Sequence, residues 1–356
     1  MNQIHSQFRL NGISFDKETL NEIGYSWVKE GQEFEVHAGN FLMDWLSSSE
    51  TVTVKTSGST GEPKALELSK KHMVNSALAT GQFFDLKPNN TALLCLSPEY
   101  IAGKMMLVRA LVLGLNLDVV VPSSQPLESI KKKYDFAAMV PLQAQNSMND
   151  LQHIKTLIIG GAPISKSLRN QLAVQSSAIF ETYGMTETIT HIAVKRLSSV
   201  RSSAVETFFE VLPNVKIDTD ERGCLIIDAP KVSTQKVITN DLVELISSNT
   251  FRWLGRYDNV INSGGIKLIP EQVEEKLSAI IKNRFFVAGI PDVKLGEKLV
   301  LFVEGKGEDG LEKKISSLKT LDKFECPKQI IYVKNFVETP TGKVKRQRIK
   351  FQFLKS

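Results

Sequence analysis

The middle of the chain alternates short apolar or β-branched runs with stretches of helical periodicity, and this alternation restricts the fold more than any other feature. Four such runs lie between residues 91 and 159: Thr91–Leu96, Leu117–Val121, Phe136–Val140 and Thr156–Ile159. Strands that are apolar along their whole length are typical of a parallel sheet covered by helices on both faces. The pattern therefore predicts an α/β fold built from βαβ units. A helix over Ser165–Val174 and a strand at Ala178–Glu181 should follow.

The sequence pattern changes after Phe208, where short strands and turns replace the βαβ pattern. The expected strands are Val215–Asp218, Gly223–Ile227, Leu242–Ile246 and Thr250–Leu254. Closely spaced strands of this kind favour an antiparallel or barrel-like subdomain. The large domain is thus expected to combine βαβ sheets with a β-rich subdomain.

The last hundred residues read as a separate α+β unit. Pro270 precedes an apolar stripe that includes Val273 and Leu277, which predicts a helix with proline in its first turn. Strands at Phe285–Gly289, Leu299–Val303 and Gln329–Val333 and a helix at Leu311–Leu318 complete the expected unit. We therefore predict a large domain at residues 1–255, a short hinge at 256–258 and a small domain at 259–356.

Cysteine usage and charge exclude several protein classes. Cys95, Cys224 and Cys326 are odd in number and far apart, which argues against a disulfide framework or a zinc cluster and favours a reduced, cytoplasmic compartment. No stretch approaches the roughly 18 apolar residues of a membrane span, so a soluble, unprocessed protein is expected. Residues 1–256 carry 25 basic and 26 acidic side chains, whereas residues 257–356 carry 19 and 13. The basic excess fits either a solvated surface or a domain that meets a polyanionic small molecule.

Between residues 56 and 64 the sequence gathers glycine, hydroxyl and lysine side chains in one loop. The residues are Thr56, Ser57, Gly58, Ser59, Thr60, Gly61, Glu62, Pro63 and Lys64. Glycines let backbone amides turn toward an anion, hydroxyl groups donate to phosphate oxygens, and lysine adds a compact positive charge. The Walker A pattern is absent. A Ser/Gly hairpin turn would explain the glycines but not the hydroxyls together with the lysine, so a phosphate-binding loop is predicted.

This loop resembles the phosphate loop of the adenylate-forming superfamily, which comprises acyl-CoA synthetases, luciferases and nonribosomal adenylation domains. The string Tyr183-Gly184-Met185-Thr186-Glu187-Thr188 is similar to the next core motif of that superfamily. The resemblance implies that the Tyr183 ring lies on adenine, that Thr186 meets the α-phosphate and that Glu187 holds Mg²⁺. These residue types suit those tasks, because a flat ring offers a stacking face and a carboxylate is a hard ligand.

Two further segments match the superfamily in the same order. Gly160-Gly161-Ala162-Pro163 follows an apolar strand and precedes a helix, where α/β proteins place ligands, and the resemblance implies that it flanks the adenine and the acyl pocket. Thr239-Asn240-Asp241 is similar to a Thr-Gly-Asp motif whose carboxylate accepts hydrogen bonds from the ribose hydroxyls. Asn240 replaces the glycine, and asparagine tolerates left-handed backbone angles better than most residues. Asp241 is therefore kept as the ribose ligand, with a solvated loop aspartate as the alternative.

The longest match runs from Gly255 to Lys267. It implies a ribose contact for Arg256 and a domain hinge at Asp258, and it implies coenzyme A binding along Gly264, Gly265 and Lys267. A glycine pair would let a thiol-bearing arm pass close to the backbone. The string Pro340-Thr341-Gly342-Lys343-Val344-Lys345-Arg346 resembles the C-terminal Pro-x-x-Gly-Lys motif. The resemblance makes Lys343 the catalytic lysine, which reaches the carboxylate and the α-phosphate.

The acyl pocket is the least specified part of the site. Ser97 to Lys104 occupies the place of a motif that usually contains histidine, and Tyr100 stands where that histidine is expected. The candidate lining residues are Tyr100, Gly103, Lys104 and Gly160. Lys104 could pair with a second substrate carboxylate, although a lysine on a helix face is more often solvated.

The motifs together imply an enzyme that activates a carboxylic acid with ATP and Mg²⁺ as an acyl-adenylate and transfers the acyl group to coenzyme A. Residues 258–271 most resemble the o-succinylbenzoate–CoA ligases of menaquinone synthesis. Only residues 1–55 precede the phosphate loop, so an N-terminally truncated large domain is expected. The partners should be small molecules, with no nucleic acid, and the protein should be a monomer or homodimer. The alternatives are another aryl or short-chain acyl-CoA ligase, or a nucleotide-binding or nucleic-acid-binding protein without enzymatic activity.

Overall fold

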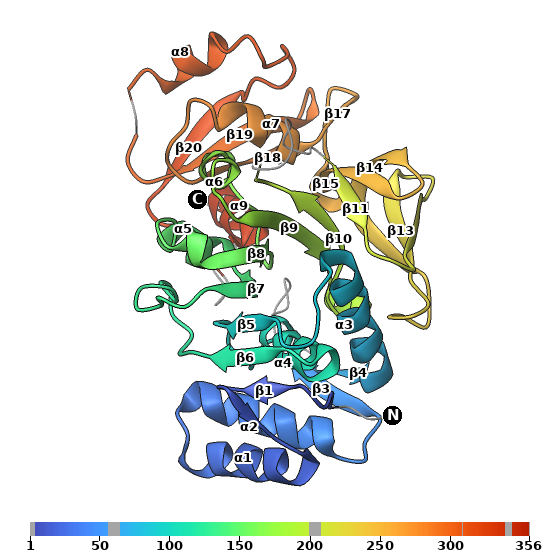
Figure 1. Ribbon diagram of the computed structural model, residues 1–356. Helices are drawn as coiled ribbons and strands as arrows, with labels where there is room; N and C mark the ends of the chain where they lie inside the picture. Colours follow the sequence, from blue (N-terminus) through green and yellow to red (C-terminus); the bar gives the residue numbers. More distant parts are fainter. Residues whose placement is uncertain (1–3, 56–64, 199–207, 308, 339–343, 356) are drawn as a thin grey trace.

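The computed structural model describes residues 4–55, 65–198, 208–307, 309–338 and 344–355 (Figure 1). Their strands form a 13-stranded sheet, a five-stranded sheet and a two-stranded hairpin. The large sheet runs through the middle of the molecule, and the five-stranded sheet lies at the end opposite the N-terminal helices. Within the described ranges, no helix is long and apolar enough to cross a membrane.

Five parallel strands form the predicted βαβ core. In chain order they are β5 (Thr91–Leu94), β6 (Asn116–Val119), β7 (Tyr134–Met139), β8 (Ile154–Ile159) and β9 (Ala178–Gly184). Neighbours in the spatial order β6-β5-β7-β8-β9 all pair in parallel. Alternate residues of β7 belong to two different apolar clusters, Phe136 and Ala138 to one and Ala137 and Met139 to the other. Because successive strand residues point to opposite faces, both faces of this sheet are buried, as the apolar runs predicted.

Helices connect these strands and cover the sheet. They are α3 (Lys70–Phe84), α4 (Ile101–Leu113), α5 (Pro141–Asn146), η1 (Leu151–His153) and α6 (Lys166–Ala173). The buried side of α4 is almost continuous from Met105 to Leu111, which places this helix deep in the core. The Ser165 side chain caps α6 by accepting a hydrogen bond from the Leu168 amide at 3.2 Å.

The first fifty residues add a helical hairpin and a sheet edge. The strands β1 (Arg9–Leu10) and β2 (Ile13–Ser14) extend the large sheet, since β1 pairs in parallel with β6. Helices α1 (Lys17–Glu30) and α2 (Glu33–Leu46) cross closely, because a Cβ at Gly24 would lie only 3.2 Å from the Gly39 carbonyl oxygen. Asp16 caps α1 through the Thr19 amide at 2.9 Å.

Beyond β9 the large sheet becomes antiparallel. The strands are β10 (His191–Arg196), β11 (Phe209–Val211), β12 (Lys216–Thr219), β13 (Cys224–Asp228), β14 (Val237–Ser247) and β15 (Thr250–Arg256). Their order from β9 is β10-β11-β15-β14-β13-β12. The antiparallel arrangement was predicted. These strands continue the parallel sheet instead of closing a separate barrel, because β10 pairs along the edge of β9.

The described residues from 260 onward form the five-stranded sheet and have their own apolar cores. We call them the small unit and call the described residues up to 256 the large unit. The strands of the small unit are β16 (Ile261–Ser263), β17 (Ile266–Leu268), β18 (Phe285–Asp292), β19 (Gly296–Glu304) and β20 (Gln329–Val333). Its helices are α7 (Pro270–Leu277), α8 (Leu311–Ser316) and α9 (Arg346–Lys355). Two clusters fill this unit, one around Val273, Leu277 and Leu301 and one around Phe286, Phe302 and Phe336. Along the chain, β15 is the last strand of the large sheet and β16 is the first strand of the five-stranded sheet. The chain therefore passes from one sheet to the other at the short helix η3 (Tyr257–Asn259).

Candidate active site

Two predicted parts of the site, the ATP-binding loop and the catalytic lysine, lie outside the described residues. They are the loop that holds Thr56, Ser57, Gly58, Ser59, Thr60, Gly61 and Lys64, and the segment that holds Lys343. The structure describes what flanks the loop: strands β3 (Thr51–Lys55) and β4 (Ala65–Ser69) pair in antiparallel register, and α3 begins at Lys70. The sequence had not indicated β4. The loop therefore joins the two strands of a hairpin, and the second strand leads directly into α3.

Glycines in two predicted motifs stand where a Cβ atom would collide with the neighbouring chain segment. Gly160 follows the last residue of β8, and a Cβ there would collide with the Thr182 hydroxyl of the neighbouring strand β9. A Cβ at Gly184 would lie 2.5 Å from the Cα of His191. Gly161 has a φ of 83°, which favours glycine. These contacts bring the segment with Ala162 and Pro163 and the Tyr183–Thr188 segment to the ends of adjacent strands.

The Tyr183–Thr188 segment ends in a strained turn. Helix η2 (Thr186–Thr188) is followed by Ile189, which has φ 67° and ψ −59°. The Thr190 amide donates to the Thr188 carbonyl at 2.8 Å, so residues 188–190 form the rare γ-turn with positive φ. Such a conformation in a β-branched residue costs about 1–3 kcal/mol and is typical of functional sites. Glu187 at this turn is exposed and has no hydrogen-bond or ion-pair partner among the described residues.

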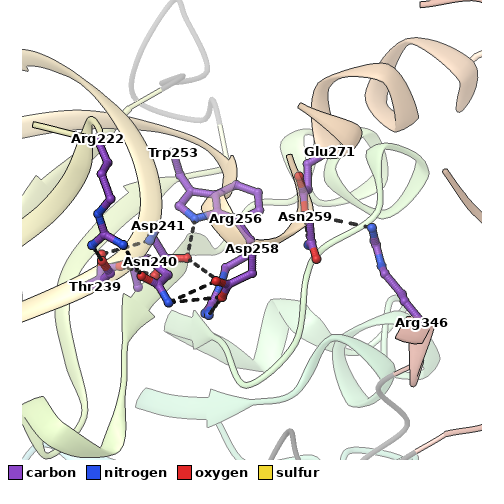
Figure 2. A network of polar contacts seen from close by, with 11 residues as sticks. Arg222, Thr239, Asn240, Asp241, Trp253, Arg256, Asp258, Asn259, Glu271 and Arg346 are labelled. Atoms are coloured by element: carbon purple, nitrogen blue, oxygen red, sulfur yellow. Dashed lines mark hydrogen bonds and ion pairs between the residues drawn. The ribbon is translucent and has the colours of Figure 1, made fainter. Parts of the chain in front are cut away.

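Asp241 is the centre of a buried polar cluster (Figure 2). It accepts hydrogen bonds from the Tyr183 hydroxyl at 2.7 Å and from the Trp253 indole at 3.2 Å, and the Arg256 Nε lies 3.7 Å from it. Burial, followed by the Asp241 charge, raises the pKa of Tyr183, so this phenol stays protonated and can donate. The Tyr183 ring packs against Phe251 with a centroid distance of 5.3 Å. The predicted adenine and ribose residues are therefore in direct contact.

The explanation of Asn240 by its tolerance of left-handed backbone angles is wrong. Asn240 lies inside strand β14, and it is not among the described residues with positive φ. Any residue can adopt the extended backbone conformation at this position, so tolerance of left-handed angles does not explain the asparagine. Its side chain instead donates to both carboxylate oxygens of Asp258, at 3.2 and 3.3 Å.

The predicted hinge residues lie beside this cluster. Arg256 ends β15, pairs across the strands with Asp241, and donates from Nη2 to Asp258 at 3.1 Å. Asn259, the residue after Asp258, donates to Glu271 of α7 at 2.6 Å. Contacts to the large sheet and contacts to the small unit thus meet within helix η3.

The predicted coenzyme A segment forms a tight hairpin between β16 and β17. Ser263 pairs with Ile266, and the two turn residues Gly264 and Gly265 have φ values of 62° and 84°. A two-residue hairpin with positive φ at both positions is a type I′ turn, which glycine favours. The turn geometry therefore accounts for the glycine pair. Lys267, on β17, is exposed.

The residues after Lys343 are anchored to the small unit. Arg346 begins α9 and donates two hydrogen bonds to Glu274 of α7, at 2.7 and 2.8 Å. Glu274 also accepts from the Val287 amide at 2.9 Å. Burial raises the pKa of Glu274 to about 7, against the opposing effect of Arg346. Paired charges thus hold the start of α9.

Three of the predicted acyl-pocket residues, Tyr100, Gly103 and Lys104, lie at the start of α4, whereas Gly160 lies at the end of β8. A Cβ at Gly103 would collide with the Ser97 carbonyl oxygen, so the loop folds tightly onto the helix. Lys104 donates to the carbonyl oxygens of Pro98 at 2.8 Å and Glu99 at 2.9 Å, which ties it to its own loop. Tyr100 is 37% exposed and precedes the first residue of α4.

Arg109, one turn further along α4, is a buried cation that the sequence analysis missed. It is 2% exposed, and no carboxylate among the described residues pairs with it. Its closest polar contacts are His191 at 3.4 Å and Thr190 at 3.5 Å, and Thr190 is the last residue of the strained turn. Its buried Nε has no hydrogen-bond partner in the described part of the chain. Burial lowers the pKa of Arg109 to about 10, so the group remains charged at neutral pH.

Comparison with known proteins shows the family. The sequence profile described as "AMP-binding enzyme" matches residues 44–224. A curated relative, the 2-succinylbenzoate–CoA ligase of Bacillus mycoides (strain KBAB4), is 23% identical over 374 residues, covering 94% of this chain and 76% of the relative.

Two solved structures share the fold. The acyl-CoA synthetase (AMP-forming)/AMP-acid ligase II-like protein from Dyadobacter fermentans DSM 18053 is 36% identical with a TM-score of 0.61, over 91% of this chain and 95% of that one. The O-succinylbenzoate coenzyme A synthetase from Bacillus subtilis, in complex with ATP and magnesium ion, is 20% identical with a TM-score of 0.71, over 84% and 69%. The resemblance to adenylate-forming enzymes is thereby confirmed, and the chain belongs to the AMP-binding enzyme family.

Proposed function

We propose that this protein is an ATP-dependent acid–thiol ligase that converts 2-succinylbenzoate to 2-succinylbenzoyl-CoA. The observation that carries the substrate class is Arg109, a buried guanidinium without a carboxylate partner among the described residues. A buried charge is costly unless it is paired, so an unpaired one favours a site whose anion arrives with the ligand. 2-Succinylbenzoate has a second carboxylate that could supply that anion. The names of the curated relatives support the same substrate.

The reaction proceeds in two half-reactions. In the first, the substrate carboxylate attacks the α-phosphorus of ATP, pyrophosphate leaves, and an acyl-adenylate forms. In the second, the thiol of coenzyme A attacks the acyl carbon, the bond to AMP breaks, and a thioester forms. Both partners of the first step are anions, and Lys343 is assigned to offset their repulsion, with Thr186 at the α-phosphate.

The nucleotide is assigned to the loop at 56–64, to Tyr183 and to the Asp241–Arg256 pair. A carboxylate has about four acceptor positions, so Asp241 can accept from ribose hydroxyls while it holds Tyr183 and Trp253. The coenzyme A arm is assigned to the Gly264-Gly265 turn and Lys267, on the basic part of the chain. Rotation about Asp258 would exchange Lys343 for this turn between the half-reactions.

Glu187 is the residue proposed to hold Mg²⁺. Magnesium in nucleotide sites is commonly bound by one or two carboxylates together with phosphate oxygens. Glu187 is exposed and unpaired in the described part of the chain, and no group of three or more His, Cys, Asp or Glu side chains there is arranged to hold a metal ion. A single carboxylate plus substrate phosphates fits this arrangement. The ion would neutralise phosphate charge during adenylation.

An acid panel tests the proposed substrate. The protein is incubated with ATP, Mg²⁺, coenzyme A and one of 2-succinylbenzoate, benzoate or acetate, and pyrophosphate release is measured. Preference for 2-succinylbenzoate is expected. Equal or better use of benzoate or acetate would reassign the protein to another aryl or short-chain ligase. Absence of acid-dependent ATP–pyrophosphate exchange, together with salt-sensitive binding to DNA or RNA, would favour the non-enzymatic alternative.

Two lysine variants test the assigned catalytic elements. Lys343→Ala should abolish adenylation and leave thioester formation from supplied acyl-adenylate largely intact. Equal loss of both half-reactions would contradict the exchange of Lys343 for the coenzyme A segment. Lys64→Ala should raise the KM for ATP, and unchanged ATP kinetics would remove Lys64 from the site.

A further inference from the structure

Position 240 carries a side chain where the superfamily motif has none, and the backbone does not explain it. Asn240 lies in the regular strand β14, where φ is not positive. An asparagine in a strand has no conformational advantage over other residues. The function of this residue should therefore be sought in the contacts of its side chain.

Those contacts reach the predicted hinge. The Asn240 Nδ2 donates to both carboxylate oxygens of Asp258, and its Oδ1 accepts from Arg222 Nη1 at 2.9 Å. Arg222 is fixed in turn by Asp220, 2.7 Å from its Nη2, and its guanidinium lies over the Tyr257 ring at 5.0 Å. Figure 2 shows Asn240 between Arg222 and Asp258.

The three residues of helix η3 contact different parts of the molecule. Tyr257 contacts Arg222, and Asp258 contacts Asn240 and Arg256. Asn240 and Arg256 lie on β14 and β15, and Arg222 lies in the turn before β13. Asn259 instead donates to Glu271 of α7. A rotation of the small unit about Asp258 turns the backbone between these two sets of contacts. The bonds from Asn240 end on the pivot residue, so a backbone rotation at Asp258 that turns its side chain away from β14 would break them.

We propose that Asn240 is a positioning residue that holds the Asp258 hinge in the domain arrangement of this structure. It rests on the proposed function, in which the small domain changes orientation between the half-reactions. The Asn240 side chain makes two hydrogen bonds to a charged group in this arrangement, and we expect a rotation about Asp258 to break them, so that they raise the population of this arrangement. A glycine at this position, as in the superfamily motif, would leave the Asp258 carboxylate with the Arg256 contact alone among the described residues.

The distance between the two units tests this directly. Glu128 of the large unit and Glu312 of α8 are exposed, and replacing both with cysteine in a Cys326→Ser background gives two spin-label sites, because Cys95 and Cys224 are buried. Double electron–electron resonance on the full chain, without substrates, then gives the distance distribution. Asn240→Gly should lower the ratio of the present arrangement to others by about three- to ten-fold.

Two companion variants keep the test specific. Asn240→Asp retains an acceptor for Arg222 but places a carboxylate against Asp258, so it should lower the ratio at least as much as Asn240→Gly. Asn214→Gly is the matched control, because Asn214 is exposed, has a φ of 66° and lies in the same antiparallel region. An unchanged distribution in both Asn240 variants, or an equal change in Asn214→Gly, would overturn the proposal.

The half-reactions give a second readout. With the preferred acid of the panel, Asn240→Gly should change the adenylation rate and the rate of thioester formation in opposite directions, since releasing the hinge disfavours one arrangement. Parallel loss of both rates would contradict a positioning role. The label distances need no acid, so failure of 2-succinylbenzoate as substrate leaves that test intact.

Discussion

Arg109 in the large unit and Arg346 in the small unit are both arginines held away from solvent, yet their surroundings differ in charge. Arg109 is 2% exposed and contacts neutral groups, namely Thr190, the imidazole of His191 and the sulfur of Met106 at 3.6 Å. The Arg346 side chain is 31% exposed and forms a two-bond ion pair with Glu274. The more deeply buried cation is the one without a carboxylate among the described residues.

This difference separates a binding role from a structural one. A compensated ion pair such as Arg346–Glu274 contributes to the folded state, and breaking it leaves a buried charge alone. An uncompensated guanidinium lowers stability by itself, and under the proposed function Arg109 gains its partner when the substrate anion binds. The comparison therefore predicts that activity depends mainly on Arg109 and stability mainly on Arg346.

The largest expected effect is on catalysis. Arg109→Met should lower kcat/KM for 2-succinylbenzoate by about 100-fold, because the substrate's second carboxylate loses a buried charged partner. The melting temperature should stay equal or rise, since an apolar side chain replaces an unpaired buried charge. Steady-state kinetics and thermal unfolding measure the two quantities, and ATP binding by calorimetry is the control.

A drop in melting temperature of Arg109→Met with unchanged kcat/KM would reverse the assignment. Arg109 would then be a structural residue despite its lack of a carboxylate partner in the described part of the chain.

The next effect is on stability. Arg346→Met should lower the free energy of unfolding by about 2–3 kcal/mol, less than the 3–5 kcal/mol of a fully buried pair because the arginine keeps some exposure. Urea unfolding measures this change. The double variant Arg346→Met with Glu274→Met should recover most of the loss, because neither charge then remains unpaired. A double variant as unstable as the single one would show that packing of α9, and not the charge pair, is responsible.

The sequence predicted the elements with strong periodicity and missed those that depend on tertiary contacts. Strand Gln329–Val333 has the predicted bounds, and the other predicted strands and helices differ mostly by a few residues at their ends. Helix α9 was not predicted, because residues Arg346–Lys355 lack a clear apolar stripe and the helix is held in part by the Arg346–Glu274 pair.

The site shows the same division. The motifs located Tyr183, Asp241 and Arg256, which the structure brings into one cluster. Arg109 was not found, because a single arginine in an apolar helix does not reveal whether a carboxylate will face it. Trp253 and Arg222 were missed for a similar reason, since their partners lie on other strands or turns and only the folded chain brings them together. Whether a carboxylate lies beside a buried cation is decided by the fold.

A smaller effect is the pH dependence, which should have opposite signs in the two regions. Burial lowers the pKa of His191 well below its usual value, with Arg109 adding to the shift. The unfolded chain then binds a proton that the folded chain does not, so stability is lost as pH falls below about 6.5. Glu274 has a raised pKa of about 7, against 4.5 in the unfolded chain, so the folded chain holds the extra proton and stability is lost as pH rises through this window.

Urea unfolding at pH 5.5 and 6.5 separates the two contributions. Glu274→Gln should leave stability that rises with pH by about 1 kcal/mol over this interval, and His191→Gln should leave stability that falls by a similar amount. If the two units unfold in separate transitions, each slope should appear in the transition of its own unit. The same slope in both variants would contradict the assignment of opposite signs.

The smallest effect is expected at a third arginine, which is paired but exposed. Arg252 on β15 forms an ion pair with Glu244 on β14, and the two side chains are 43% and 51% exposed. Water already solvates both charges, so Arg252→Met should change the free energy of unfolding by less than about 0.5 kcal/mol. Urea unfolding in parallel with Arg346→Met gives the comparison. A loss at Arg252 as large as that at Arg346 would mean that pairing alone determines the contribution of these arginines, and the unpaired state of Arg109 would then lose its meaning as a sign of a ligand site.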